Sequence, residues 1–385
     1  MASFTISMKH TVVSLAVIGL VIAALKWLPA SFIWIYTGLA LFFFLLYRRN
    51  TLSARVIWFN AGGIFLVLLL FELTLEGREY WLRRDHPSGV GHQVYVSKPH
   101  PVLGYVLLPG SARRLWKSYG GRNDHDVTYT INDQGFRIAP PATRASDRSV
   151  LFFGCSFTYG EGVEDDETMP YRVGDRLDGR YAVHNFAVHG YGPQHMLALI
   201  ETGVVEGTVV AKPEVAVYQA LYPEHVHRVA GLRNWVRTGP RYVIGADGRA
   251  VHSGRFVDHD YSIPAFPLWR LVEKSALGRF AAGYTRPTGP DEDALFVAVL
   301  VRSAELLRER YPGLAFHLLM WGHPPPAVID GLESAGVELH YAEAILEAAG
   351  IPDNAVYIDH DGHPTAQAHA ALGEYLLGVR SGFLH

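Results

Sequence analysis

The chain has 385 residues and a formal net charge of −3, from 34 basic and 37 acidic side chains. This near balance gives no strongly basic surface, so a nucleic-acid partner is not expected. The only cysteine is Cys155, which excludes an intrachain disulfide. The length allows one large globular domain together with additional segments.

Three apolar runs, at 12–25, 32–47 and 56–75, fill the first part of the chain. A membrane-spanning helix needs about 20 mostly apolar residues, and a cleaved signal peptide would show one such run, not three. Residues 1–80 are therefore predicted to be a transmembrane anchor of about three helices. The alternative is a set of buried helices in a soluble domain. Aromatic residues that suit the membrane–water interface flank the runs: Trp27, Trp34, Tyr36 and Trp58.

Basic residues between the runs indicate the orientation of this anchor. Arg48, Arg49 and Arg55 separate the second and third runs, whereas only Lys26 separates the first two. Because cytoplasmic loops are enriched in Lys and Arg, the arginine loop is placed in the cytoplasm. With three spans, everything after Leu75 then lies on the outer side of the membrane.

The rest of the chain predicts an α/β fold. Residues 81–148 are rich in Gly, Pro and short β-like pieces, and are interpreted as a β-rich preface packed on the domain that follows. Residues 149–385 alternate strand-like and helix-like segments, which favours a parallel sheet with helices on both faces. Strands are expected at 149–154, 182–187, 215–221 and 314–321, and helices at 168–177, 194–202, 296–310 and 365–377.

A long insertion, at about 226–290, interrupts this alternation. It contains two short β runs joined around Asp247-Gly248, a dipeptide typical of a hairpin turn. An insertion at this place is often a lid or a substrate-selecting element. A plain surface excursion is the alternative.

Ser156 follows the first strand directly, in the run FFGCSFTYGEGV. Gly154 and Gly160 allow the backbone to turn tightly around it. A serine at the end of a buried parallel strand lies at the edge where such sheets place their sites, but it needs a base to become a nucleophile. A Gly-Ser turn without chemistry is the alternative.

His363 is the candidate base, and Asp361 is placed to orient it, just before the final helix. Pro364 suits the first turn of that helix. His360 and Asp359 are close rivals. A polar loop with a helix cap explains the same residues without chemistry.

Together these segments resemble the SGNH (GDSL-like) hydrolase and acyltransferase family over residues 149–378. Gly154-Cys155-Ser156 resembles the family's first block with Cys in place of Asp, Asn185 and Gly190 resemble the second, and the DGHP run resembles the last. LGYVLLPG and INDQGFR resemble the preface of membrane-linked bacterial relatives. The resemblance implies an SGNH-type three-layer sandwich with a central parallel sheet.

One family block is missing, the Gly-x-Asn whose side chain completes the oxyanion hole. The corresponding run is YQALYPEHVHR, where His225 is expected to replace the Asn and Arg228 is a second candidate. The backbone N–H groups of Ser156 and Gly190 supply the other donors, and Asn185 and Arg228 are expected to support the site or contact the substrate. His225 and His227 could instead form one side of a metal site on a strand, or a polar strand end. No metal and no organic cofactor are expected.

The resemblance implies a Ser156–His363–Asp361 triad that hydrolyses esters of O-acylated glycans, envelope polymers or lipids. An O-acyltransferase that modifies an exported polysaccharide is the alternative enzyme. A non-catalytic component of an envelope or polysaccharide-assembly complex is the alternative of another class. The expected location is a multi-pass anchor in a bacterial inner membrane, with the catalytic domain periplasmic or extracellular. Its expected partners are the lipid bilayer, the acylated substrate and a membrane protein of the same pathway.

Overall fold

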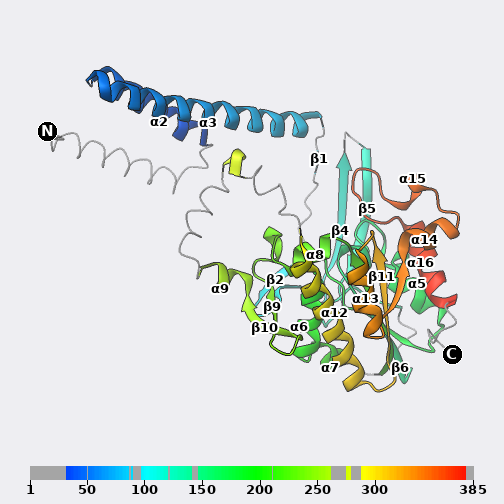
Figure 1. The fold of residues 1–385 in the computed structure, drawn as a ribbon. Coiled ribbons are helices and arrows are strands. Elements are labelled where there is room, and N and C mark those ends of the chain that lie inside the picture. Colours follow the sequence, from blue (N-terminus) through cyan, green and yellow to red (C-terminus); the bar gives the residue numbers. More distant parts are fainter. Residues whose placement is uncertain are drawn as a thin grey trace. The chain divides into compact units, whose positions relative to one another are not determined.

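A computed structural model describes the chain over residues 32–49, 51–85, 88–89, 97–119, 122–140, 146–209, 211–261, 275–278 and 288–378. Figure 1 shows its elements along the chain. The chain divides into two compact units, a helical unit and an α/β unit. Each is described by itself.

Two helices, α2 (Phe32–Arg49) and α3 (Leu52–Asp85), pack against each other in the helical unit. Among the described residues, one helix is long and apolar enough to cross a membrane, at Ala54–Arg78, with Phe32–Arg48 a shorter apolar helix. The first predicted run, at 12–25, lies outside the described residues. These findings give one candidate anchor helix and do not test the predicted number of three spans.

Part of the predicted insertion belongs to the helical unit. Glu72 of α3 is fully buried, and its carboxylate accepts hydrogen bonds from the backbone N–H groups of Ala276 (2.7 Å) and Leu277 (3.0 Å). Residues 275–278 therefore pack on α3 within the helical unit. A carboxylate on an apolar helix needs such donors, because a buried charge without partners is costly.

The α/β unit is built on a five-stranded sheet in the order β12-β11-β8-β6-β7, with every neighbouring pair parallel. The inner strands β6, β8 and β11 are mainly apolar because helices cover both faces of the sheet. The four predicted strands are confirmed, and the edge strand β12 was not predicted. The strands are β6 (Arg148–Phe153), β7 (Ala182–Asn185), β8 (Lys212–Leu221), β11 (Ala315–Trp321) and β12 (Glu338–Tyr341).

Alternate residues of each strand enter two separate cores, as the two-residue period of a strand requires. Leu151 and Phe153 of β6 face the core that includes α6 and α12, whereas Val150 and Phe152 face the core that includes α5 and α16. Figure 1 shows these helices around the sheet. This is a three-layer α/β arrangement. The main covering helices are α5 (Met169–Arg176), α6 (Pro193–Glu201), α12 (Pro290–Arg310) and α16 (Ala366–Gly378).

The predicted preface forms short antiparallel pairs. The pairs are β2 (Ser97–His100) with β3 (Gly104–Leu107), and β4 (Ala112–Tyr119) with β5 (Arg122–Thr130), to which the short β1 (Ser88–Gly89) is added. Leu103, Leu107, Tyr129 and Ile131 are buried in the same core as α6 and α12. The preface is thus packed into the α/β unit.

The predicted hairpin around Asp247-Gly248 is confirmed as β9 (Pro240–Ile244) paired with β10 (Ala250–Arg255). Residues 224–229, by contrast, form helix α8 (Glu224–Val229), so the prediction that His225 and His227 share one side of a strand is wrong. The shorter helices are α4 (Ser156–Tyr159), α7 (Val204–Thr208), α9 (Phe256–Tyr261), α13 (Pro326–Ser334), α14 (Ala342–Ala348) and α15 (Asp353–Val356).

Candidate active site

Ser156 is the first residue of α4, immediately beyond the carboxyl end of β6. The turn depends on Gly154, whose φ of 155° is accompanied by a very close approach: a Cβ atom there would lie 2.2 Å from Thr158 Oγ1. Gly160 ends the helix with φ 84°, and its N–H donates to the Ser156 carbonyl at 2.9 Å. Both glycines are therefore required to place the serine at the sheet edge.

Asn185 holds this short helix against the loop that follows β7. Its Nδ2 donates to the carbonyl of Thr158 at 3.2 Å, and its Oδ1 accepts from the N–H of Ala187 at 3.1 Å. The Thr158 hydroxyl donates to Gln219 of β8 at 2.7 Å. Asn185 is fully buried and thus positions α4 without facing a substrate.

Asp361 and His363 come together in the loop before α16. The Asp361 carboxylate, fully buried, is in hydrogen-bond contact with Nδ1 of His363. The His363 ring packs edge-on against Phe157, which follows Ser156, at 5.6 Å between ring centroids. His360 and Asp359, the rivals, are exposed. The loop thus brings the predicted base, oriented by its carboxylate, against the residue that follows the predicted nucleophile.

The other nitrogen of His363 faces a residue that the sequence did not single out. Its Nε2 lies 3.6 Å from Oε2 of Glu161, and the side chains of both are mostly buried. The Ser156 hydroxyl makes one hydrogen-bond contact among the described residues, a long one of 3.9 Å to Cys155 Sγ. The Ser156–His363 hydrogen bond therefore stays a prediction, and catalytic hydrogen bonds are often long before a substrate binds.

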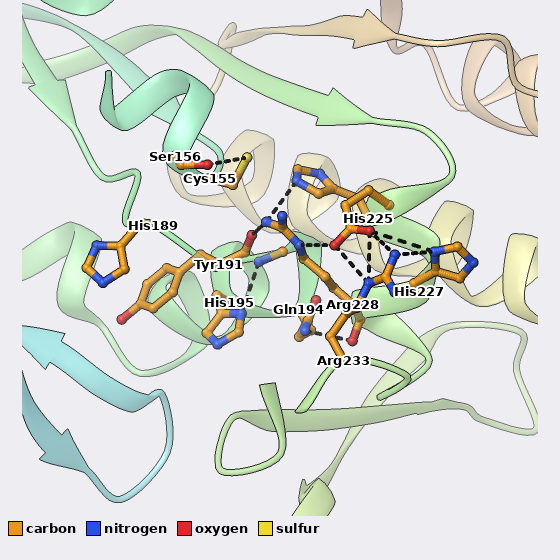
Figure 2. A network of polar contacts seen from close by, with 12 residues as sticks. Cys155, Ser156, His189, Tyr191, Gln194, His195, His225, His227, Arg228 and Arg233 are labelled. Carbon is orange, nitrogen blue, oxygen red and sulfur yellow. Dashed lines mark hydrogen bonds and ion pairs between the residues drawn. The ribbon is translucent and has the colours of Figure 1, made fainter. Parts of the chain in front are cut away.

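Arg228 lies at the centre of the polar network in Figure 2, which runs from Tyr191 to Arg233. Its Nη1 donates to the carbonyl of Tyr191 at 2.6 Å, and its Nε donates to Glu224 at 3.1 Å. Within the described part of the chain, Nη2 makes no hydrogen bond. The Cys155 thiol, next to Ser156, is near enough to contribute to raising the Arg228 pKa, although burial of the guanidinium acts against it. A charged donor thus lies close to the Ser156 turn.

His225 is held inside the core by contacts at both of its ring nitrogens. It is fully buried, with Nδ1 2.9 Å from the Tyr218 hydroxyl and Nε2 3.4 Å from Nη1 of Arg228. Since a guanidinium only donates, Nε2 must accept, and the one proton of the neutral ring is left on Nδ1 towards Tyr218. Burial, together with Arg228 and His195, keeps the ring neutral by lowering its pKa. In this arrangement both ring nitrogens of His225 are engaged within the protein, and its oxyanion role stays a prediction.

Gly190 is enclosed by two residues from other segments. Its φ is 78°, and a Cβ atom there would lie 2.5 Å from the Tyr105 hydroxyl and 3.2 Å from Cδ1 of Trp235. Tyr105 comes from β3 of the preface and donates to the carbonyl of His189. Trp235, from the insertion, is half exposed. The preface and the insertion thus both contribute walls to the site.

Comparisons with known proteins find only distant structural likenesses. No protein-family model and no curated protein matches the chain. Among solved structures, it resembles TesA (17% identity, 61% of this chain and 99% of that one, TM-score 0.35) and a putative lipolytic protein of the G-D-S-L family from Desulfitobacterium hafniense DCB-2 (10%, 60% and 97%, 0.30). It also resembles an acetyl xylan esterase, Est2A, from Butyrivibrio proteoclasticus (13%, 66% and 68%, 0.35).

Proposed function

We propose that this chain is a serine-dependent esterase of the SGNH type that acts on O-acylated glycans, envelope polymers or lipids. The observation that carries the proposal is the Asp361–His363 pair. The carboxylate of Asp361 is buried, and the ring of His363 packs on Phe157, the residue after Ser156. A histidine held through Nδ1 by a carboxylate and placed next to a serine at a sheet edge is the arrangement that acyl transfer needs.

In the proposed reaction, Nε2 of His363 takes the Ser156 proton while Oγ attacks the ester carbonyl. The tetrahedral intermediate collapses, and the imidazolium returns the proton to the leaving alkoxide. Asp361 stabilises the imidazolium and keeps the proton of the neutral ring on Nδ1. Water, or an acceptor hydroxyl, then attacks the acyl-serine and completes the cycle.

Labelling by a fluorophosphonate tests the nucleophile, because the reagent reacts only with an activated serine. The full-length chain should be labelled, and Ser156→Ala and His363→Ala should lose the label. Ser334→Ala, on the exposed face of α13, should react like the native chain. If the native chain stays unlabelled while it binds an acylated glycan, the non-catalytic alternative is the better one.

For the oxyanion hole, we propose backbone N–H groups of Ser156 and Gly190 and, as the third donor, Arg228 in place of His225. The support is the Nη2 group of Arg228, which carries protons that no described residue accepts. Arg228→Lys should lower kcat by roughly ten- to a thousandfold with little change in KM, because the contact forms in the transition state. A larger loss of kcat in His225→Gln, with the fold intact, would return the role to His225.

Hydrolysis and transfer differ only in what attacks the acyl-serine. The exposed Trp235 beside Gly190 offers an aromatic face that a sugar ring can stack on, and it supports a glycan as substrate or acceptor. Product analysis with and without an added acceptor sugar separates the two: acylated acceptor in place of free acid indicates a transferase.

We also propose that the α/β unit lies outside a bacterial inner membrane. The apolar span Ala54–Arg78 and the arginines before it support this orientation. A reporter active only outside the cytoplasm, fused at the C-terminus, should work. Activity of a cytoplasm-only reporter at the same position would contradict the orientation.

A further inference from the structure

Three potential metal ligands meet near the edge of the sheet, away from the Ser156 turn. His317 belongs to β11, and Glu338 and His340 belong to the neighbouring β12. The parallel register pairs His317 with Glu338 and Leu319 with His340. Because side chains two residues apart share a face, all three point to the same side of the sheet. We propose that His317, Glu338 and His340 bind a divalent first-row metal ion, with Zn²⁺ the best match.

The three ligand atoms already have nearly the required spacing. His317 Nδ1 lies 3.0 Å from His340 Nε2, and the Glu338 carboxylate oxygens lie 3.5 Å and 3.8 Å from these two nitrogens. Ligands about 2.0–2.2 Å from a tetrahedral Zn²⁺ are roughly 3.4 Å apart. The 3.5 Å and 3.8 Å distances run to different oxygens of Glu338, so rotation of the carboxylate together with movements of a few tenths of an ångström would place one oxygen and the two nitrogens around one ion.

Both imidazoles are in the protonation state that a metal requires. Burial lowers the pKa of His317 to about 4; His340 and Arg308 add to the effect, and Glu338 opposes it. Burial also lowers the pKa of His340, against the opposing effect of Glu338. A metal ion binds the neutral form of imidazole, which burial favours at both positions.

Without a metal ion, the two rings share one hydrogen bond between His317 Nδ1 and His340 Nε2, so one of these nitrogens carries a proton. A metal ion bound to both nitrogens would replace that proton. The proton then moves to the other nitrogen of the same ring, so the pair of rings loses no proton when the metal ion binds. For His340 the far nitrogen, Nδ1, faces the Tyr375 hydroxyl at 3.1 Å. A hydrogen bond of this kind fixes the tautomer of most metal-binding histidines.

The site has an entrance and an open coordination position. The Glu338 side chain is 40% exposed, whereas those of His317 and His340 are almost fully buried. An ion can therefore enter beside Glu338 and keep a water molecule as its fourth ligand. Two imidazoles, one carboxylate and a water suit Zn²⁺ better than Ca²⁺ or Mg²⁺, which prefer all-oxygen sites.

The position indicates a structural role. Among the described strands, β12 lies at the edge of the sheet and pairs with β11, so a shared ion would tie it to the sheet. His317 precedes Trp321 by four residues, or about 13 Å along the strand, and it is Trp321 that packs on Phe157 next to Ser156. The ion would thus stay outside the proposed catalytic chemistry.

Metal binding by the full-length chain in detergent tests the proposal. After chelator treatment and loading with ZnCl₂, about one Zn²⁺ should remain per chain after dialysis. Its Tm should rise by about 5 °C at free Zn²⁺ a hundredfold above Kd, because only the folded state holds the ligands together. Co²⁺ in place of Zn²⁺ should give the visible absorption of a tetrahedral site.

The matched variants are Glu338→Gln, which removes one ligand at a partly exposed position, and Glu333→Gln on the neighbouring exposed helix end. Glu338→Gln should raise Kd at least about tenfold, and Glu333→Gln should leave it unchanged. If the native chain neither retains Zn²⁺ nor gains Tm, the site does not exist. Equal binding by the two variants would place the ion elsewhere and overturn the assignment. Fluorophosphonate labelling of Ser156 should be the same with and without the ion, so the two proposals fail separately.

Discussion

Oε2 of Glu161 lies 3.6 Å from Nε2 of His363, the nitrogen that would take the proton of Ser156. A carboxylate at this distance attracts the positive charge that His363 gains when it takes the serine proton. In Glu161→Gln that attraction is lost while the shape is kept. The rate of fluorophosphonate labelling should therefore fall roughly three- to tenfold.

The exposed Glu347 on α14 supplies the control, Glu347→Gln, whose labelling rate should match the native chain. An unchanged or faster rate for Glu161→Gln would show that Glu161 does not assist His363.

Asp361 and Asp359 are two residues apart, but only Asp361 contacts His363. Asp361→Asn should lower kcat by about a hundred- to ten-thousandfold, because an amide no longer favours the Nδ1–H tautomer. The rate of ester turnover by Asp361→Asn and by the control Asp359→Asn measures this loss of kcat. Asp359→Asn, at an exposed position, should retain activity within about twofold, and the reverse ranking would identify the wrong carboxylate.

Arg137 joins the preface to the loop that follows the nucleophile. It is fully buried, pairs with Asp165 at 2.8 Å, and lies over the ring of Tyr129 at 4.5 Å. Arg137→Lys keeps the charge but cannot reach the same set of acceptors, so the free energy of unfolding should fall by about 2–4 kcal/mol. The carbonyl acceptors belong to Thr128, Tyr159, Gly160 and Val163.

Denaturant midpoints followed by Trp fluorescence test this, with the exposed Arg113→Lys of β4 as the control. A midpoint for Arg137→Lys equal to that of the control would mean that the buried network does not stabilise the fold.

His369 should make the fold sensitive to acid. Burial, with Arg137, Arg172 and His363 adding to it, lowers the pKa of His369 to about 3, whereas an unfolded histidine titrates near 6.5. Between these values the unfolded chain binds one more proton, so this contribution is complete above pH 6.5 and is lost as the pH falls towards 3.

In His369→Gln, the unfolding free energy should therefore depend less steeply on pH between 6 and 4, by up to about 1.4 kcal/mol per pH unit. Denaturant titrations across this range measure the slope. His323→Gln, at an exposed position, should leave the slope unchanged. An unaltered slope for His369→Gln would mean that the ring is protonated in the folded chain.

The sheet and its covering helices were predictable because long apolar strands and amphipathic helices carry strong local patterns. Strand β12 was missed because it has only four residues, two of them polar. Residues 224–229 were interpreted as the end of a strand, yet they form α8 once Pro223 and Glu224 begin a helix. Short segments take the structure that their neighbours impose, and sequence patterns over so few residues do not show this.

Much of the candidate site could be predicted in the same way. Asp361 and His363 are two residues apart, so their pairing needs only a turn. Glu161, Tyr105 and Trp235 come from three separate segments, and nothing in their local sequence indicates that they surround His363 and Gly190. The role of His225 depended on which way one ring faces inside a core, and packing against Tyr218 and Arg228 decides that direction.

The strand order β12-β11-β8-β6-β7 has a consequence for where any ligand can bind. From β6 the chain crosses one face through α5 to reach β7, and then crosses the other face through α6 to reach β8 on the opposite side of β6. The chain leaves β6 across one face of the sheet and leaves β8, through α12, across the other. Parallel sheets bind their ligands at such a switch point, beyond the carboxyl ends of the two strands. Since the winding of the chain creates this position, a variant without Ser156 should still bind its ligand, and inactive Ser156→Ala protein is the form in which to capture it.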